Sequence, residues 1–247
     1  MLLVWDHYTP SRAESQRIRV FIRAVTCSVR AAYSPVWSGG PTEGHVSRLA
    51  FAERQGCGRT GFELPRKRWT RSQYRQFVSL GMIEEGAPYE LIEGEVVQDL
   101  GQGRLHVFVA MRVFTEMIRL FGEERVQSQA PITADEHNVP EPDVAVLRGT
   151  LSDYLEEDPG PEDILLLVEV SNTTLQFDRG VKAAIYARTG IPEYWVLDVN
   201  GRTLDVYRQP ALGGYGSVTR LTDVESVSPL SAPDASLTVA GFLPPLA

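Results

Sequence analysis

The feature that most limits how this chain can fold is the segment ILLLVEVS, residues 164–171. It opens with an uncharged apolar stretch of five residues, Ile164–Val168, and no apolar run of the sequence is longer. That stretch is far shorter than the ~20 residues that a membrane-spanning helix needs. A short apolar run is typical of a strand buried in the middle of a sheet. We therefore expect a central sheet with other elements packed on it.

Helical and extended patterns alternate around this strand. Thr70 is a typical helix N-cap and Gly81 a typical stop, whereas Glu93-Gly94 and Asn200-Gly201 predict turns between strands. The expected helices are 71–80, 105–121 and 178–190, the last capped by Asp178. The expected strands are two within 89–100, then 125–135, 142–149, 164–171, 191–199 and 202–209, and two short ones within 218–221 and 236–242. Residues 150–163 are expected to form a surface loop.

The long helix is expected to pack on the sheet through a single apolar face. That face comprises Leu105, Phe108, Val109, Val113, Met117 and Leu120. The order of elements predicts a mixed α/β (α+β) domain in which helices flank one central mixed β-sheet. A doubly wound nucleotide-binding fold is disfavoured, because the sequence holds neither G-x-G-x-x-G after a strand nor G-x-x-x-x-G-K-[ST].

Charge is divided unevenly along the chain. Residues 1–75 hold 13 cationic and 5 acidic side chains, whereas residues 76–247 hold 11 and 27. Residues 1–62 show no sustained apolar period, although a short helix over 14–29 stays open. We predict a basic, flexible N-terminal extension over 1–62 and a folded domain over 63–247. An ordered but irregular appendage, or a start codon assigned too far upstream, would also account for the first segment.

Two further absences bear on location. Cys27 and Cys57 are too few for a disulfide framework, and the first residues show no basic lead followed by an apolar segment. They predict a reducing, cytoplasmic location without a membrane partner.

Three residues suggest where the chemistry lies. Asp143 begins the strand PDVAVL, Glu169 lies near the end of the apolar strand, and Lys182 is on the helix that follows. A carboxylate inside a central strand is costly to bury unless it is paired or binds a cation. Two such carboxylates on neighbouring strands would repel, and a hard divalent cation relieves that repulsion. Asp143, Glu169 and Lys182 are therefore the predicted catalytic residues of metal-dependent phosphodiester hydrolysis, with Mg²⁺ or Mn²⁺ held by the two carboxylates.

The choice of lysine strengthens this prediction. Of the 24 cationic side chains, only Lys67 and Lys182 are lysine. A site built for a compact ammonium would reject the larger, planar guanidinium. The structural alternative is that Glu169 and Lys182 form a buried ion pair while Asp143 only caps a strand. Glu90, His106 and Asp178 are candidate accessory residues, although Asp178 is first of all expected to be a helix cap.

At these residues the sequence resembles a known family. The similarity covers residues 64–244 and consists of PDVAV, the E-V-S segment, the helix start D-R-G-x-K and the strand I-P-E-Y-W in that order, with YELIEGEVV and His106 upstream. This combination resembles the restriction endonucleases of the Uma-two family, in the PD-(D/E)XK nuclease superfamily. The resemblance implies a restriction-endonuclease-like core.

The same resemblance implies roles for single residues. Asp143 would be the motif aspartate and Glu169 the second metal carboxylate, with the backbone carbonyl of Val170 as an extra ligand. The superfamily's lysine normally stands two residues after the glutamate, where this chain has Ser171. In the family the lysine is thought to have moved to the following helix, where Lys182 stands.

The leading hypothesis is therefore a metal-dependent endonuclease acting on DNA, and a homodimer is plausible because a duplex has two strands. One alternative is a nuclease-fold module that binds nucleic acid or protein without hydrolysis. The other is a hydrolase of a different phosphate ester.

Overall fold

The computed structural model describes residues 66–84, 86–98 and 103–245, within the compact unit Arg66–Ala247. The extension predicted over 1–62, with the helix considered over 14–29, lies outside the described residues.

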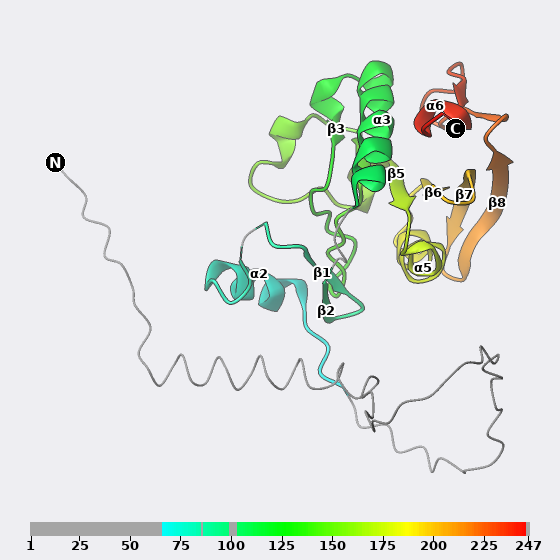
Figure 1. The fold of residues 1–247 in the computed structure, drawn as a ribbon. Coiled ribbons are helices and arrows are strands. Elements are labelled where there is room, and N and C mark those ends of the chain that lie inside the picture. Colours follow the sequence, from blue (N-terminus) through cyan, green and yellow to red (C-terminus); the bar gives the residue numbers. More distant parts are fainter. Residues whose placement is uncertain (1–65, 85, 99–102, 246–247) are drawn as a thin grey trace, which may run out of the picture. The chain divides into compact units, whose positions relative to one another are not determined.

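A six-stranded sheet in the order β3-β4-β5-β6-β7-β8 forms the centre of this unit (Figure 1). Neighbouring strands are antiparallel except for β5 and β6, which run parallel. The expectation that 164–171 is a central strand is confirmed by the place of β5. The strands are β3 (Val126–Gln127), β4 (Val144–Leu147), β5 (Ile164–Ser171), β6 (Glu193–Asp198), β7 (Thr203–Ala211) and β8 (Gly214–Thr222).

A helical crossover joins β5 to β6, because parallel neighbours cannot be connected by a tight turn. It is one continuous helix made of α4 (Leu175–Phe177), the π-helical turn η5 (Asp178–Lys182) and α5 (Ala183–Arg188). The prediction that Asp178 caps this helix is wrong, since the N-cap is Thr174. The Asp178 carboxylate accepts hydrogen bonds from side-chain hydroxyls, and its backbone continues the helix.

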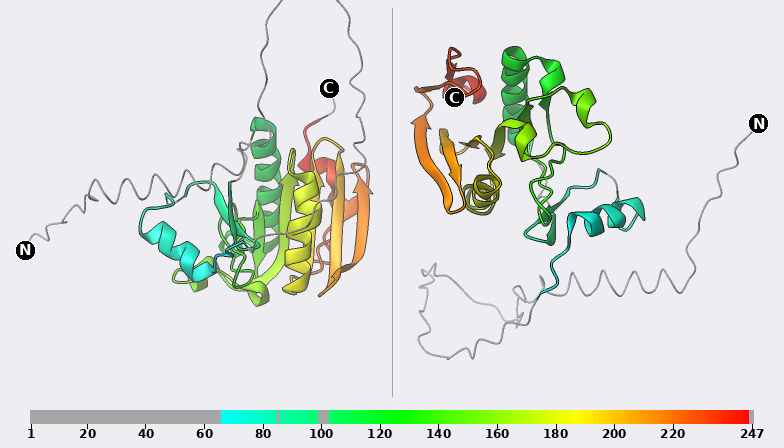
Figure 2. Two further views of the ribbon diagram at one scale, coloured as in Figure 1. Left: turned by 90° about the horizontal axis from the view of Figure 1, so that it is seen from below. Right: turned by 180° about the vertical axis from the view of Figure 1, so that it is seen from behind.

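Helices cover both faces of the sheet. Helix α3 (Arg104–Phe121) packs with Val168 and Trp195, whereas α5 packs with Leu167 and Tyr194. Successive strand residues point to opposite faces, so α3 and α5 lie on opposite sides. The short helix α6 (Val239–Phe242) joins α3 on its side, and Figures 1 and 2 show α6 and α5 on the two sides of the sheet. Among the described helices, none is both long and apolar enough to cross a bilayer.

The bounds predicted for α3 are confirmed, and its predicted buried face is confirmed in part. Leu105 and Phe108 are exposed, and His106 and Ala110 are buried instead. At the start of the helix the His106 ring contacts the Asp143 carboxylate, and Ala110 belongs to the core cluster. Val109, Val113 and Met117 are buried as expected.

Three other segments differ from the prediction. Within 125–135 only Val126–Gln127 is a strand, because Gln129 takes a positive φ of 50° and turns the chain. Within 236–242, β10 (Leu237–Thr238) pairs with β9 (Ser226–Val227), and the chain then becomes α6. Its buried Val239 and Phe242 are three residues apart, which is a helical spacing. The short 3-10 turns are η2 (Glu123–Arg125), η3 (Leu151–Tyr154) and η4 (Pro161–Asp163), the last two inside the loop expected over 150–163.

The N-terminal part of the unit is a helix and a hairpin, as predicted. Thr70 caps α2 (Arg71–Ser79) in a reciprocal capping box with Gln73. The strands β1 (Tyr89–Ile92) and β2 (Glu95–Gln98) flank the Glu93-Gly94 turn. One bridge between Leu91 and Val139 joins this hairpin to the segment before β4, which brings β1 close to the start of that strand.

Gly94 allows us to test how the hairpin is fixed. Its φ is +75°, and a Cβ there would lie 2.7 Å from the Cβ of Arg68. Gly86 has nearly the same φ, +74°, but no atom within 4 Å of such a Cβ. We expect Gly94→Ala to lower the free energy of unfolding by about 1–3 kcal/mol more than Gly86→Ala, because only the first adds a clash to the left-handed backbone cost. Urea unfolding measures both, and equal losses would contradict the expectation.

Asp205 of β7 provides a second test. It accepts hydrogen bonds from Arg179 of η5 at 2.6 Å and from Arg220 of β8 at 2.6 Å. Burial alone would raise the pKa of Asp205, but the hydrogen bonds and charges of Arg220 and Arg179 outweigh it and hold the pKa below its usual value. A depressed pKa stabilises the fold above the unfolded-state value of 3.8, and this stabilisation is lost as the pH falls through the folded-state pKa.

We therefore expect unfolding free energies of Asp205→Asn, measured between pH 7 and pH 2.5, to fall less steeply below pH 4 than those of the wild type. If the unfolding free energies of the two proteins fall equally steeply below pH 4, Asp205 does not contribute in this way.

Candidate active site

The register of two strands brings the first pair of predicted residues together. Val144 of β4 lies opposite Val168 of β5 in an antiparallel pair. Continuing that register by one residue places Asp143 opposite Glu169. Both carboxylates are buried, at 5% and 4% exposure. Like charges directly opposite each other on neighbouring strands are destabilising, so this position requires compensation.

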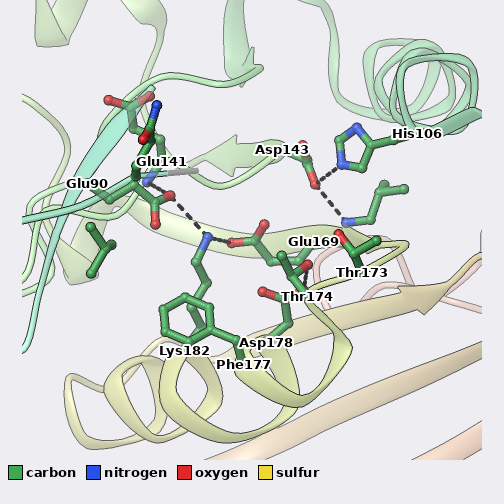
Figure 3. A pocket seen from close by; sticks show the side chains of 13 residues that line it. Glu90, His106, Glu141, Asp143, Glu169, Thr173, Thr174, Phe177, Asp178 and Lys182 are labelled. Atoms are coloured by element: carbon green, nitrogen blue, oxygen red, sulfur yellow. Dashed lines mark hydrogen bonds and ion pairs between the residues drawn. The ribbon is translucent and has the colours of Figure 1, made fainter. Parts of the chain in front are cut away.

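Lys182 supplies part of that compensation. Its ammonium donates to Oε1 of Glu169 at 2.8 Å and to Oε1 of Glu90 at 3.1 Å, from a side chain that is itself buried (Figure 3). Burial alone would lower the pKa of Lys182, but the charges of Glu169 and Glu90 outweigh it and hold the pKa well above its usual value. Lys182 therefore carries a positive charge at neutral pH.

The pKa of Glu169 is also shifted by its surroundings. Burial raises its pKa well above the usual value, Lys182 opposes that rise, and the nearby charges of Asp178 and Asp143 add to it. The two pKa values therefore rise for different reasons: burial is the main cause for Glu169, whereas the charges of the neighbouring carboxylates are the cause for Lys182.

Asp143 is held by two donors on one oxygen. Its Oδ2 accepts from the backbone N–H of Val170 at 2.8 Å and lies 3.1 Å from Nε2 of His106. The N–H of Val170 thus points toward Asp143, and in an extended strand the carbonyl of the same residue points to that side as well. The backbone of Val170 therefore faces the gap between the two strands.

Asp178 is the first residue of the π-helical turn and lies close to the end of β5. Its Oδ2 accepts from the hydroxyl of Ser171 at 2.6 Å and from that of Thr174 at 2.6 Å. Ser171 is the residue at which the resemblance noted from the sequence would lead one to expect a lysine. Its hydroxyl instead fixes the first turn of the crossover helix against the end of β5.

A cavity of about 310 Å³ lies among these groups, and all seven residues named from the sequence line it. They are Glu90, His106, Asp143, Glu169, Val170, Asp178 and Lys182 (Figure 3). The other lining residues are Val97, Gln98, Glu141, Thr173, Thr174 and Phe177. The sequence reasoning did not name these six.

Glu141, and also Tyr186 beside the cavity, left a signal in the sequence. Glu141 stands two positions before Asp143, a spacing that keeps side chains on one side of an extended segment, and its N–H donates to Glu90 at 2.9 Å. Tyr186 stands four positions after Lys182 on the same helix face, and its hydroxyl donates to Oε1 of Glu169 at 3.2 Å. The remaining missed residues near this helix are Thr173, Thr174 and Phe177. They lie at the start of the crossover helix, whose position depends on the pairing of β5 with β6 and not on the local sequence.

The oxygen donors of the cavity fit a hard cation. Among the described residues, the hydrogen bonds to Glu90, Asp143, Glu169 and Asp178 fall on one oxygen of each carboxylate, which leaves the second oxygen for water or an ion. In that same part of the chain no three His, Cys, Asp or Glu side chains converge enough to hold a metal alone. One or two carboxylates completed by waters is the usual arrangement around Mg²⁺.

The structural alternative considered from the sequence describes the same contacts. Glu169 and Lys182 do form a buried ion pair, and Asp143 does bond the backbone of a neighbouring strand. These contacts alone fit a catalytic centre as well as a structural cluster. The assignment of roles to single residues stays a prediction.

The stability of the cluster can be tested by removing its cation. We expect Lys182→Met to lower the free energy of unfolding at pH 7 by about 3–5 kcal/mol, because Glu169 and Glu90 would stay buried without a partner. Adding Glu169→Gln should recover part of that loss. Urea unfolding of the single and double variants measures both effects, and a Lys182→Met protein within 1 kcal/mol of the wild type would contradict the expected coupling.

Comparisons with known proteins agree with this architecture. The sequence profile of the family Uma2, described as "Putative restriction endonuclease", matches residues 72–240. A search of curated proteins found no significant match. A similar solved structure is the crystal structure of "a putative nuclease belonging to DUF820" from Anabaena variabilis ATCC 29413. It aligns with a TM-score of 0.55 and 16% identity, covering 70% of this chain and 96% of that chain, and the likeness confirms the predicted fold.

Proposed function

Because this chain belongs to the Uma2 family, whose description is "Putative restriction endonuclease", we propose that it is a metal-dependent endonuclease that hydrolyses phosphodiester bonds of DNA. Membership confirms the resemblance noted from the sequence and supports a nuclease in general terms. The metal, the DNA substrate and the catalytic residues are parts of the proposal.

The observation that carries it is the opposed pair Asp143 and Glu169 with Lys182 at 2.8 Å from the second carboxylate. A fold gains no stability from burying two like charges face to face. Such an arrangement is common where a cation and a phosphate must be bound.

Asp143, Glu169 and the carbonyl of Val170 would hold Mg²⁺ or Mn²⁺. When bound, such an ion lowers the pKa of a ligated water and neutralises charge that develops on the phosphate. The contacts of His106 and the Val170 N–H on Oδ2 of Asp143 fix that carboxylate, so that its other oxygen is presented to the ion. His106 is therefore a positioning residue in this proposal.

Lys182 acts as a donor. Because the charges of Glu169 and Glu90 raise its pKa, the side chain acts as an ammonium rather than as a base in this proposal. It can orient the attacking water or bind a phosphate oxygen. Glu90 is the second partner of Lys182, so it would keep the ammonium at the cavity if Glu169 held a cation.

One observation favours the alternative of a binding module without hydrolysis. Lys182 already has two carboxylate partners at 2.8 and 3.1 Å, as a purely structural cation would. The two functions differ in whether a metal and catalysis appear. A homodimer, which would bring two cavities to the two strands of a duplex, stays a prediction.

We expect the full-length protein to nick supercoiled DNA in Mg²⁺ or Mn²⁺ and to lose this activity in EDTA. Asp143→Asn, Glu169→Gln and Lys182→Met should each reduce the rate at least about 100-fold. The first two remove a negative charge that would bind the metal, and the third removes the positive charge that would bind the phosphate or orient the water. Gel quantification of nicked and linear products measures the rates.

Glu193→Gln is the matched control. Glu193 is a fully buried carboxylate on β6 that pairs with Arg208 and does not line the cavity, so its loss should leave nicking intact. Melting temperatures with and without Mg²⁺ add a second measurement, because an ion that binds only the folded state raises them. Nicking that survives in all three cavity variants would refute the catalytic assignment. No nicking and no stabilisation by either metal would favour the binding module.

A further inference from the structure

The helix that carries Lys182 contains a structural irregularity where it enters the site. Over η5, Asp178–Lys182, the helix widens into a π turn, and the N–H of Ala183 reaches back to the carbonyl of Asp178. Single π turns inside α-helices are rare. The extra residue sets the register of everything after it, because an α-helix turns by about 100° per residue.

Tyr194 of β6 holds this turn from the neighbouring strand. Its hydroxyl donates to the carbonyl of Asp178 at 3.1 Å. A carbonyl oxygen has two lone pairs, so it can accept this bond together with the π-turn bond from Ala183. Tyr194 is fully buried, and burial raises its pKa well above the usual value, so the hydroxyl stays a donor.

Tyr186 links the same aromatic group to the site. The rings of Tyr186 and Tyr194 meet edge to face with centroids 4.9 Å apart. The Tyr186 hydroxyl donates to Oε1 of Glu169, the oxygen that also accepts from Lys182. The π turn and the site carboxylate are thus connected through two packed tyrosines.

We propose that Tyr194 is a positioning residue, whose hydrogen bond to the Asp178 carbonyl holds the π turn in the register that brings Lys182 to Glu169 and Glu90. Tyr194 does not line the cavity, so it acts only through Lys182. Its effect on hydrolysis rests on the proposed function. Its effect on the position of Lys182 can be measured without any substrate.

The chain offers a matched control for this role. Tyr215 belongs to the same group of rings, 6.4 Å from Tyr194, and its hydroxyl donates to the carbonyl of Ile191 at 2.9 Å. Tyr194→Phe and Tyr215→Phe therefore each remove one hydroxyl from a backbone carbonyl and keep the ring. We expect similar falls in melting temperature for the two variants. Only Tyr194→Phe should disturb the site.

The first readout uses the scarcity of lysine. With Lys67 and Lys182 as the only two lysines, protein labelled with ¹⁵N-lysine gives two side-chain signals, which Lys67→Arg assigns. In the metal-free protein Tyr194→Phe should shift or broaden the Lys182 signal, and Tyr215→Phe should leave it unchanged. Hydrogen exchange at the Ala183 amide should accelerate in the first variant only, since that amide makes the π-turn bond.

The second readout is DNA nicking. We expect Tyr194→Phe to lower kcat about 10- to 100-fold with an unchanged KM, because a misplaced donor impairs the reaction more than binding. A Lys182 signal, an Ala183 exchange rate and a kcat that all match those of Tyr215→Phe would overturn the proposal. A disturbed Lys182 signal in a protein whose wild type cuts no DNA would support the positioning role and count against the proposed function.

Discussion

The antiparallel register of β4 on β5 is the constraint on which the site depends. By setting Asp143 opposite Glu169 it creates a repulsion that strand pairing alone cannot relieve. Relief comes from different parts of the fold. The ammonium of Lys182 arrives from the crossover helix, His106 from α3, and the N–H of Val170 from β5 itself. The two helices that pack around one end of β5 therefore also supply groups that compensate part of the repulsion between Asp143 and Glu169.

The balance of charge in the cavity is incomplete. Glu90, Asp178 and the opposed pair outnumber Lys182. Their charges raise the pKa of Lys182 and add to the rise that burial causes in the pKa of Glu169. A dication and a phosphate would complete the balance together, since the cation compensates the carboxylates while the ammonium remains available to the anion. That complementarity is the reason for which we propose that a nuclease site lies at this cluster.

Local patterns were sufficient for most of the fold and for part of the site. The strand β5, the bounds of α3 and the hairpin turns follow from apolar period and turn residues, which depend on a few neighbours. Asp143, Glu169 and Lys182 could be named because charges beside apolar strands are costly. The buried His106 face of α3 and the π turn at Asp178 could not be derived from helical period. They are set by contacts between elements distant in the sequence, as is the hydrogen bond of Tyr186 to Glu169.

The single parallel pair among the described strands has a consequence for how the protein fluctuates. Because β5 and β6 run the same way, the chain between them must cross a face of the sheet, and the turn that bears Lys182 belongs to that obligatory connection. Local opening of the cavity on this side would uncover the core between α5 and the sheet as well. The crossover helix therefore covers both the cavity and part of the core, so that a local opening of this helix would expose both.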